Sequence, residues 1–162
     1  MKILQIVGNK KVGKTTLMLE WIGLAKSEGL KVACLKRAHE AVMDTPETDS
    51  YRFAAAGADG VGLSTAGEFL WHEKRSVEVS EILEKYMAQE VDVLLIEGFR
   101  ASSFDGWKLE LIGPMSKERI LPEGELQALR GSLFSEELAQ GVEDLTSREA
   151  RKALFTRLLE EK

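Results

Sequence analysis

The sequence is poor in residues that staple or interrupt a small fold. Its 162 residues include one cysteine, three prolines and two histidines. Cys34 alone can form no internal disulfide, which is typical of a chain from a reducing compartment. Two histidines and one cysteine, spread along the chain, are too few for a transition-metal site. A chain of this length can bury a sufficient core without disulfides or metals.

An excess of positive charge and long apolar runs are also missing. With 22 Lys and Arg against 27 Asp and Glu, the net charge is -5, which argues against broad binding to nucleic acid or anionic membranes. No apolar run approaches the roughly 18 residues of a membrane-spanning helix, and the N-terminal run lacks the pattern of a signal peptide. We therefore expect a cytoplasmic protein that holds any anion with local donors.

Strand-like and helix-like stretches alternate along the chain. Apolar runs predict strands over 2–7, 32–35, 61–63 and 91–96, and alternation predicts one over 107–112. Helical spacing predicts helices over 14–28 and 78–89, and a cap at Asp49 or Ser50 with Gly57 at the end predicts a short helix through Ala56. Thr146 and Glu149 have the spacing of a capping box at the start of a last helix. Region 113–145 carries no clear pattern. The alternation predicts a single α/β domain over 1–162, with three layers and a mostly parallel sheet flanked by helices.

The stretch GNKKVGKTT, residues 8–16, matches the Walker A pattern between a strand and a helix. Gly8 and Gly13 permit a tight turn whose backbone N–H groups face phosphate oxygens at a helix N-terminus. Lys14 is expected to reach the phosphates and Thr15 to offer its hydroxyl to Mg²⁺. The cradle also includes Asn9, Lys10, Lys11, Val12 and Thr16, with the two lysines at its surface. The pattern predicts a nucleoside triphosphate ligand.

A P-loop needs a carboxylate that holds the metal or orders a water, and Glu97 ends the strand-like run VDVLLIE at the ligand side of a parallel sheet. We predict catalytic roles for Lys14 and Glu97. Candidates for the metal or its surroundings are Asp44 and Asp49, and candidates for phosphate or substrate are Lys36, His39 and Arg100.

The stretches GNKKVGKTTLMLEWI, VACLKRAHEAVMDTPETDSYRFAAAGADGV and VDVLLIEGFR together resemble the molybdopterin-guanine dinucleotide biosynthesis protein B (MobB) family over about residues 1–112. The specific elements are Lys36 before a histidine-containing loop, Asp44-Thr45-Pro46, Asp49-Ser50-Tyr51-Arg52 and Glu97-Gly98-Phe99-Arg100.

The resemblance implies a P-loop GTPase-like fold, homodimers, and GTP binding with weak hydrolysis. It also implies an accessory role beside the guanylyltransferase that joins GMP to molybdopterin. Residue by residue, it assigns Gly13, Lys14, Thr15 and Thr16 to phosphate and Mg²⁺, Glu97 to the metal, and His39, Asp44, Asp49 and Arg52 to a loop facing nucleotide, molybdopterin or its guanine dinucleotide. Strand 107–112 is a candidate exposed edge for dimerisation.

Two residues depart from the family pattern. Only His39 remains of a histidine-rich loop, and Val12 replaces a usual serine while leaving the backbone cradle intact. An Asn-Lys-x-Asp motif for guanine is absent, because Asn9 is the only asparagine and lies in the phosphate turn.

The main alternative to this accessory role is a small-molecule or nucleotide kinase. Its usual late lid arginines are not evident here, since Arg119 and Arg130 are scattered and Arg148, Arg151 and Arg157 are expected at solvated positions of the last helix. Partitioning ATPases and metal-delivery GTPases fit the sequence less well.

Overall fold

The computed structural model describes residues 1–37, 45–73, 75–114, 120–121, 127–134, 138 and 140–161. The chain divides into two compact units, 1–37 with 84–162 and 38–83. We call them the sheet unit and the hairpin unit. Among the described residues, no helix is long and apolar enough to cross a membrane.

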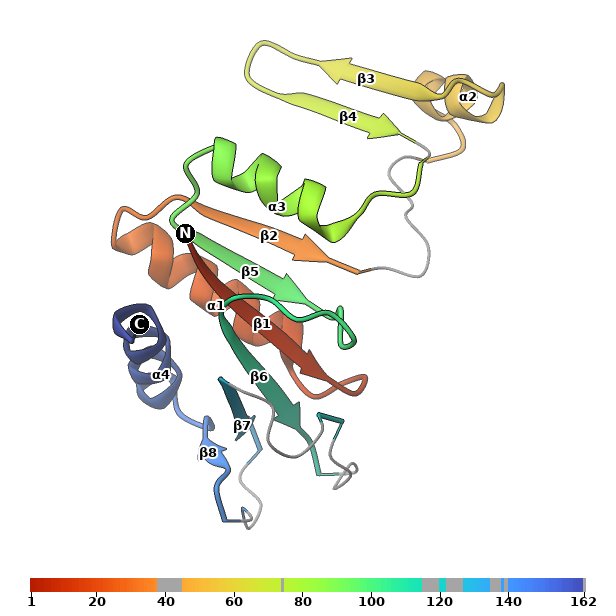
Figure 1. Cartoon of the computed structure of the whole chain (residues 1–162). Helices are drawn as coiled ribbons and strands as arrows, with labels where there is room; N and C mark the ends of the chain where they lie inside the picture. Colours follow the sequence, from red (N-terminus) through yellow and green to blue (C-terminus); the bar gives the residue numbers. More distant parts are fainter. Residues whose placement is uncertain are drawn as a thin grey trace. The chain divides into compact units, whose positions relative to one another are not determined.

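The sheet unit is built on a six-stranded sheet with the order β2-β5-β1-β6-β7-β8, and every neighbouring pair is parallel (Figure 1). Its strands are β1 (Lys2–Gly8), β2 (Val32–Lys36), β5 (Val93–Glu97), β6 (Trp107–Ile112), β7 (Ala128–Ser132) and β8 (Glu143–Asp144). The predicted α/β class with a mostly parallel sheet is confirmed. Burial follows the apolar runs, because β1 and β5 are buried over nearly their whole length.

One face of this sheet carries the main hydrophobic core. Helix α1 (Lys14–Ser27) packs against β1, β2 and β5, and helix α4 (Arg148–Glu160) packs against α1. Trp21 and Phe155 are fully buried and their ring centroids are 5.5 Å apart. The core also includes Leu4, Ile6, Leu17, Val93, Leu95, Leu109, Leu111, Leu145, Leu154 and Leu158. This core fixes the start of α1 relative to the carboxyl end of β1.

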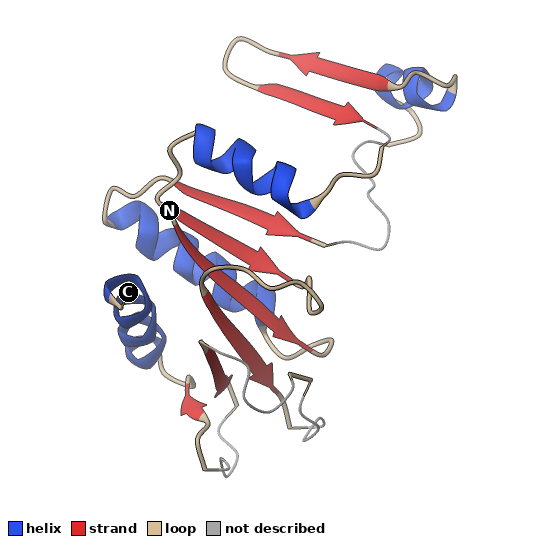
Figure 2. Cartoon of the chain, in the orientation of Figure 1, coloured by secondary structure: helices blue, strands red, loops and turns tan. Residues whose placement is uncertain are grey.

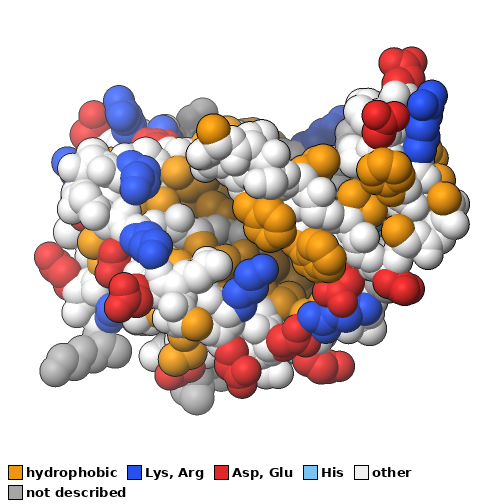
Figure 3. Space-filling model, turned by 90° about the horizontal axis from the view of Figure 1, so that it is seen from above, with side chains coloured by type: hydrophobic (Ala, Val, Ile, Leu, Met, Phe, Trp, Pro, Cys, Tyr) orange, Lys and Arg blue, Asp and Glu red, His pale blue; other side chains and the backbone are white. Residues whose placement is uncertain are grey.

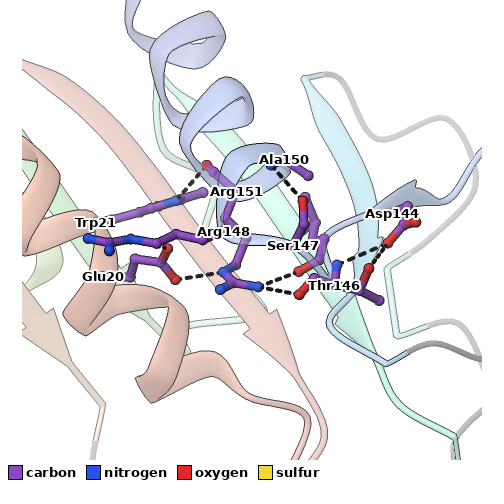
Figure 4. A network of polar contacts seen from close by, with 9 residues as sticks. Glu20, Trp21, Asp144, Thr146, Ser147, Arg148, Ala150 and Arg151 are labelled. Carbon is purple, nitrogen blue, oxygen red and sulfur yellow. Dashed lines mark hydrogen bonds and ion pairs between the residues drawn. The ribbon is translucent and has the colours of Figure 1, made fainter.

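Arg151 joins the two core helices in a way the sequence did not predict (Figure 4). Its Nε donates to Glu20 Oε2 at 2.6 Å, its Nη1 donates to the carbonyls of Leu145 and Thr146, and its own carbonyl accepts from Trp21 Nε1 at 3.2 Å. Only 16% of the Arg151 side chain is exposed. The prediction that Arg151 is solvated is therefore wrong, because its guanidinium pairs with polar groups where α4 packs against α1.

The hairpin unit contains α2 (Asp49–Ala55) and a two-stranded antiparallel sheet, β3 (Gly60–Ser64) with β4 (Phe69–Glu73). Helix α3 (Val79–Ala88) continues into the sheet unit, where the Tyr86 hydroxyl donates to the carbonyl of Cys34. Figure 2 shows these elements by type. The expected strand 61–63 exists but belongs to this hairpin, since β4 was missed and supplies its partner.

Three local expectations are corrected. Strand β6 is interior, between β1 and β7, so it is no exposed edge; β7 and β8 come from the region that carried no clear pattern. Helix α2 is capped by Thr48, whose side chain accepts from Tyr51 N, rather than by Asp49 or Ser50. Helix α4 is capped by Ser147, one residue after the predicted Thr146, whose hydroxyl instead donates to Asp144.

Candidate functional site

The turn after β1 has the backbone shape that a phosphate cradle requires. Gly13 has φ 90° and stands at the N-cap of α1, with no side chain capping the helix. A Cβ at Gly8 would lie 2.6 Å from the Leu111 carbonyl oxygen and 2.8 Å from a Val12 methyl group, so only glycine fits there. The uncapped N–H groups and the helix dipole together suit an anion.

Val12 turns its side chain away from the cradle. Only 3% of it is exposed, and its side chain packs in the core beside Gly8 and Gly113. Its side chain is therefore structural, and only its backbone can take part in a cradle. The neighbouring Lys10 and Lys11 are exposed, and Lys11 adopts φ 64° to complete the turn.

Lys14 stands at the first position of α1. Its ammonium donates to the Asn9 carbonyl at 2.6 Å across the turn. Burial lowers the pKa of Lys14, Glu97 opposes this by attraction, and the positive charges of Arg100 and Lys36 lower it further. The ammonium is thus held inside the turn, where an anionic ligand would favour its charged form.

Glu97 ends β5 next to this turn, because β5 pairs with β1 on one side and β2 on the other. Its carboxylate oxygen Oε2 accepts from the Thr15 hydroxyl at 3.3 Å and lies 3.5 Å from Lys36 Nζ. Only 13% of the Glu97 side chain is exposed. A hydroxyl beside a carboxylate is the pair of oxygen ligands that protein-bound Mg²⁺ commonly uses together with phosphates. The residues present therefore fit the metal that the pattern predicts.

Arg100 reaches the same place from the segment after Glu97. Its Nη2 donates to the Gly8 carbonyl at 3.4 Å. The structure thus brings together Lys14, Thr15, Lys36, Glu97 and Arg100, which come from the start of α1, the ends of β2 and β5, and the segment after β5. Three cations and one carboxylate around an uncapped helix N-terminus can hold a polyphosphate.

The remaining candidates are placed elsewhere or not described. Thr16 is exposed in the first turn of α1. Asp49 and Arg52 belong to the hairpin unit and form an exposed ion pair with each other at 3.4 Å. His39 and Asp44 lie outside the described residues. Within the described part of the chain, no group of three or more His, Cys, Asp and Glu side chains could hold a metal ion.

Sequence reasoning missed two buried polar residues beneath this site, Gln5 and Lys108. Gln5 interrupts the apolar run Ile3–Val7, and this polar side chain within an apolar strand was the available signal. Lys108 is the second residue of the alternating stretch Trp107–Ile112, so nothing in the sequence distinguished it from a solvated position.

A six-stranded parallel sheet with a glycine turn between its central strand and first helix defines an α/β protein of the P-loop NTPase fold. The family model of molybdopterin guanine dinucleotide synthesis protein B (MobB) matches residues 3–129. The chain therefore belongs to the MobB family.

Known relatives agree with this assignment. A probable molybdopterin-guanine dinucleotide biosynthesis adapter protein of Bacillus subtilis (strain 168) is 34% identical over 107 residues, which is 63% of this chain and 61% of that protein. The crystal structure of Bacillus subtilis MobB superposes with a TM-score of 0.78 at 25% identity, covering 99% of this chain and all of the other. A MobB homologue from Bacillus stearothermophilus has a TM-score of 0.69 at 20% identity, covering 100% of both chains, which shows the fold alone.

Proposed function

We propose that this chain binds GTP with Mg²⁺ at the turn 8–16 and acts as an adapter in molybdopterin guanine dinucleotide biosynthesis. In this role it assists the guanylyltransferase that attaches GMP to molybdopterin, and its own hydrolysis of GTP is weak. The proposal adds ligand, metal and partner to the family membership. In this proposal Lys14 binds the phosphates, and Thr15 and Glu97 hold the Mg²⁺.

The observation that carries the proposal is the Thr15–Glu97 contact at 3.3 Å beside the Lys14 ammonium. A lone phosphate turn would need only backbone donors and Lys14. The acid of the neighbouring strand, together with Thr15, would hold the Mg²⁺, which would neutralise negative charge on the phosphates. Lys36 and Arg100 add two positive charges on the same side, which favours a triphosphate with its larger negative charge over a monophosphate.

Nucleotide binding is tested by calorimetric titration of the wild-type chain and Lys14→Ala with Mg·GTP and Mg·ATP. We expect Lys14→Ala to cost roughly 2–5 kcal/mol of binding free energy, the range for removing one partner of a buried charged pair. Lys152→Ala, an exposed lysine of α4, is the matched control and is expected to bind as the wild type does. Equal affinities of wild type and Lys14→Ala would remove the assignment.

The adapter role has its own test. We expect slow GTP turnover by the chain alone and a measurable complex with the guanylyltransferase. Absence of the complex, together with undiminished guanylated cofactor in a deletion strain, would contradict it. Rapid formation of GDP or ADP that depends on a nucleoside or sugar acceptor would point to the kinase alternative.

We also propose that the chain forms homodimers. Because β6 is interior, the candidate surface for dimerisation is the exposed apolar side of the hairpin unit. Phe69 is 70% exposed and Trp71 54%, and Leu63 and Leu70 are also exposed; hydrophobic side chains at the surface are orange in Figure 3. The Trp71 ring lies over Gly60, where any Cβ would collide with it. An apolar hairpin of this kind suits a second copy of the chain. Sedimentation should give a dimer for the wild type and a monomer for Trp71→Lys, and a wild-type monomer at micromolar concentration would refute the proposal.

A further inference from the structure

The segment 98–106 between β5 and β6 begins with two residues in the left-handed region, Gly98 at φ 91° and Phe99 at φ 54°. For phenylalanine this conformation is uncommon and persists only where the surroundings impose it. The turn begins where the pairing of β5 with β1 ends, since Gly98 N still donates to the Ile6 carbonyl. The residue that follows it is Arg100.

Two buried side chains hold this segment from below. Gln5 Nε2 donates to the carbonyls of Gly98 at 2.7 Å and Phe99 at 2.8 Å, which are the two left-handed residues. Lys108 Nζ donates to the Ser102 carbonyl at 3.3 Å. Gln5 and Lys108 are neighbours across β1 and β6, and they are 1% and 6% exposed. The sheet therefore fixes the segment through side-chain donors at three of its carbonyls.

The fixed turn sets the direction of two cations. Arg100 Nη2 reaches the Gly8 carbonyl at 3.4 Å, at the entrance of the phosphate turn. The guanidinium carbon of Arg37 lies 5.6 Å from the centroid of the Phe99 ring, whose other neighbour is Phe104 in an edge contact at 6.2 Å. A different backbone at 98–99 would turn Arg100 away from the turn at 8–16.

Gln5 satisfies the turn at the expense of its own oxygen. Its Oε1 atom is buried and has no hydrogen-bond partner within the described part of the chain. A buried amide oxygen without a partner costs free energy, which offsets part of what the two bonds to the carbonyls of Gly98 and Phe99 contribute. Such a cost is typical of a residue that serves a site.

We propose that Gln5 is a positioning residue of the nucleotide site, assisted by Lys108: its two N–H donors hold the 98–99 turn so that Arg100 faces the phosphates. The assignment rests on the proposed nucleotide binding. Gln5 itself touches no ligand and acts through Arg100.

The test compares Gln5→Met, Arg100→Ala and the double variant in the full-length protein. Methionine keeps the length and apolar body of glutamine and removes both donors. We expect Gln5→Met to speed amide hydrogen exchange in 98–104 without nucleotide and to weaken Mg·GTP binding about tenfold, the scale of one misplaced charge-assisted contact. The double variant should bind no more weakly than Arg100→Ala alone.

Gln89→Met, at an exposed position, is the matched control and should change none of these quantities. Unchanged exchange and affinity in Gln5→Met would overturn the assignment, as would a loss that adds in full to that of Arg100→Ala. A lowered melting temperature with unchanged exchange in 98–104 would make Gln5 a residue of the core only. If the wild type binds neither Mg·GTP nor Mg·ATP, the proposed function fails and this assignment fails with it; wild-type binding with a normal Gln5→Met variant overturns the assignment alone.

Discussion

The sheet unit and the hairpin unit use their apolar residues in opposite ways. Every buried hydrophobic side chain among the described residues belongs to the sheet unit, and the described hairpin residues contribute none. In the hairpin unit, Phe53, Phe69 and Trp71 are all more than half exposed. The sheet unit thus carries its own core and the candidate site, whereas the large apolar side chains described in the hairpin unit lie mostly at its surface.

The ion pairs of the two units also differ in burial: the sheet unit has a buried pair, and the hairpin unit has exposed ones. Glu110 on β6 is fully buried and accepts from Arg130 Nε at 3.0 Å and from Ile120 N at 2.5 Å. In the hairpin unit, Arg75 pairs with Glu73 and Glu81 at the surface. Solvent screens exposed pairs, so only the first is expected to matter for folding.

The largest expected effect contrasts one phenylalanine from each unit. Phe155→Ala removes a fully buried ring packed on Trp21 and should cost about 3–5 kcal/mol of unfolding free energy. Phe69→Ala, at 70% exposure, should change it by no more than about 0.5 kcal/mol in the dilute monomer. Urea unfolding followed by circular dichroism measures both. Comparable losses in the two variants would show that the hairpin unit has a core of its own.

The second contrast uses the ion pairs. Arg130→Met leaves the Glu110 carboxylate buried without its charged partner and should cost ~3 kcal/mol, the lower end of the range because a fifth of Arg130 is exposed. Arg75→Met in the hairpin unit should leave the main unfolding transition where it is, because its partners are solvated. Urea unfolding followed by circular dichroism measures the unfolding free energy of both variants. A stable Arg130→Met variant would contradict the assigned weight of this buried pair.

The two units should also respond at opposite ends of the pH scale. The lowered pKa of Lys14 implies that nucleotide affinity is constant below that pKa and falls as pH rises through it, earlier than for a lysine at the ordinary 10.5. In the hairpin unit, hydrogen bonds from Arg75 lower the pKa of Glu73 and of Glu81. The local stability that these bonds give the hairpin unit is therefore present above the ordinary pKa of 4.5 and is lost as pH falls through the lowered values.

Calorimetric titration across the alkaline range measures the first response, with Lys14→Arg as a control that stays charged. Fluorescence of Trp71 in acid measures the second, with Arg75→Met as its control. Affinity of the wild type that stays level up to the pH where free lysine titrates would contradict the assigned burial of Lys14.

The part of the sheet unit around the candidate site could be predicted from the sequence, because its signals are local. The apolar runs of β1 and β5, the glycines of the turn and the acid at the end of β5 each indicate a position, and parallel strand ends meet at one edge. The contacts of Lys14, Thr15 and Glu97 therefore agree with the grouping expected from spacing alone.

What the sequence did not show depends on long-range packing. Arg151 has the pattern of a solvated helix residue, and only the approach of Glu20, 131 positions away, makes it part of the helix interface. Gln5 supports carbonyls 93 and 94 positions away. Strands β7 and β8 are short and weakly apolar, so their pairing comes from the sheet they extend and not from their own pattern.

The smallest expected effect separates the predicted helix cap from the observed one. Ser147→Ala removes the oxygen that accepts from Ala150 N at 3.0 Å and should cost about 1 kcal/mol, because α4 then begins with an unsatisfied donor. Thr48→Ala makes the same change at α2, where the hairpin unit should lose local order while the main unfolding transition stays in place. Thr146→Ala removes only the hydroxyl bond to Asp144 and should cost less than Ser147→Ala. Thermal unfolding of the three variants ranks them, and a larger loss for Thr146→Ala would restore the capping box that the sequence predicted.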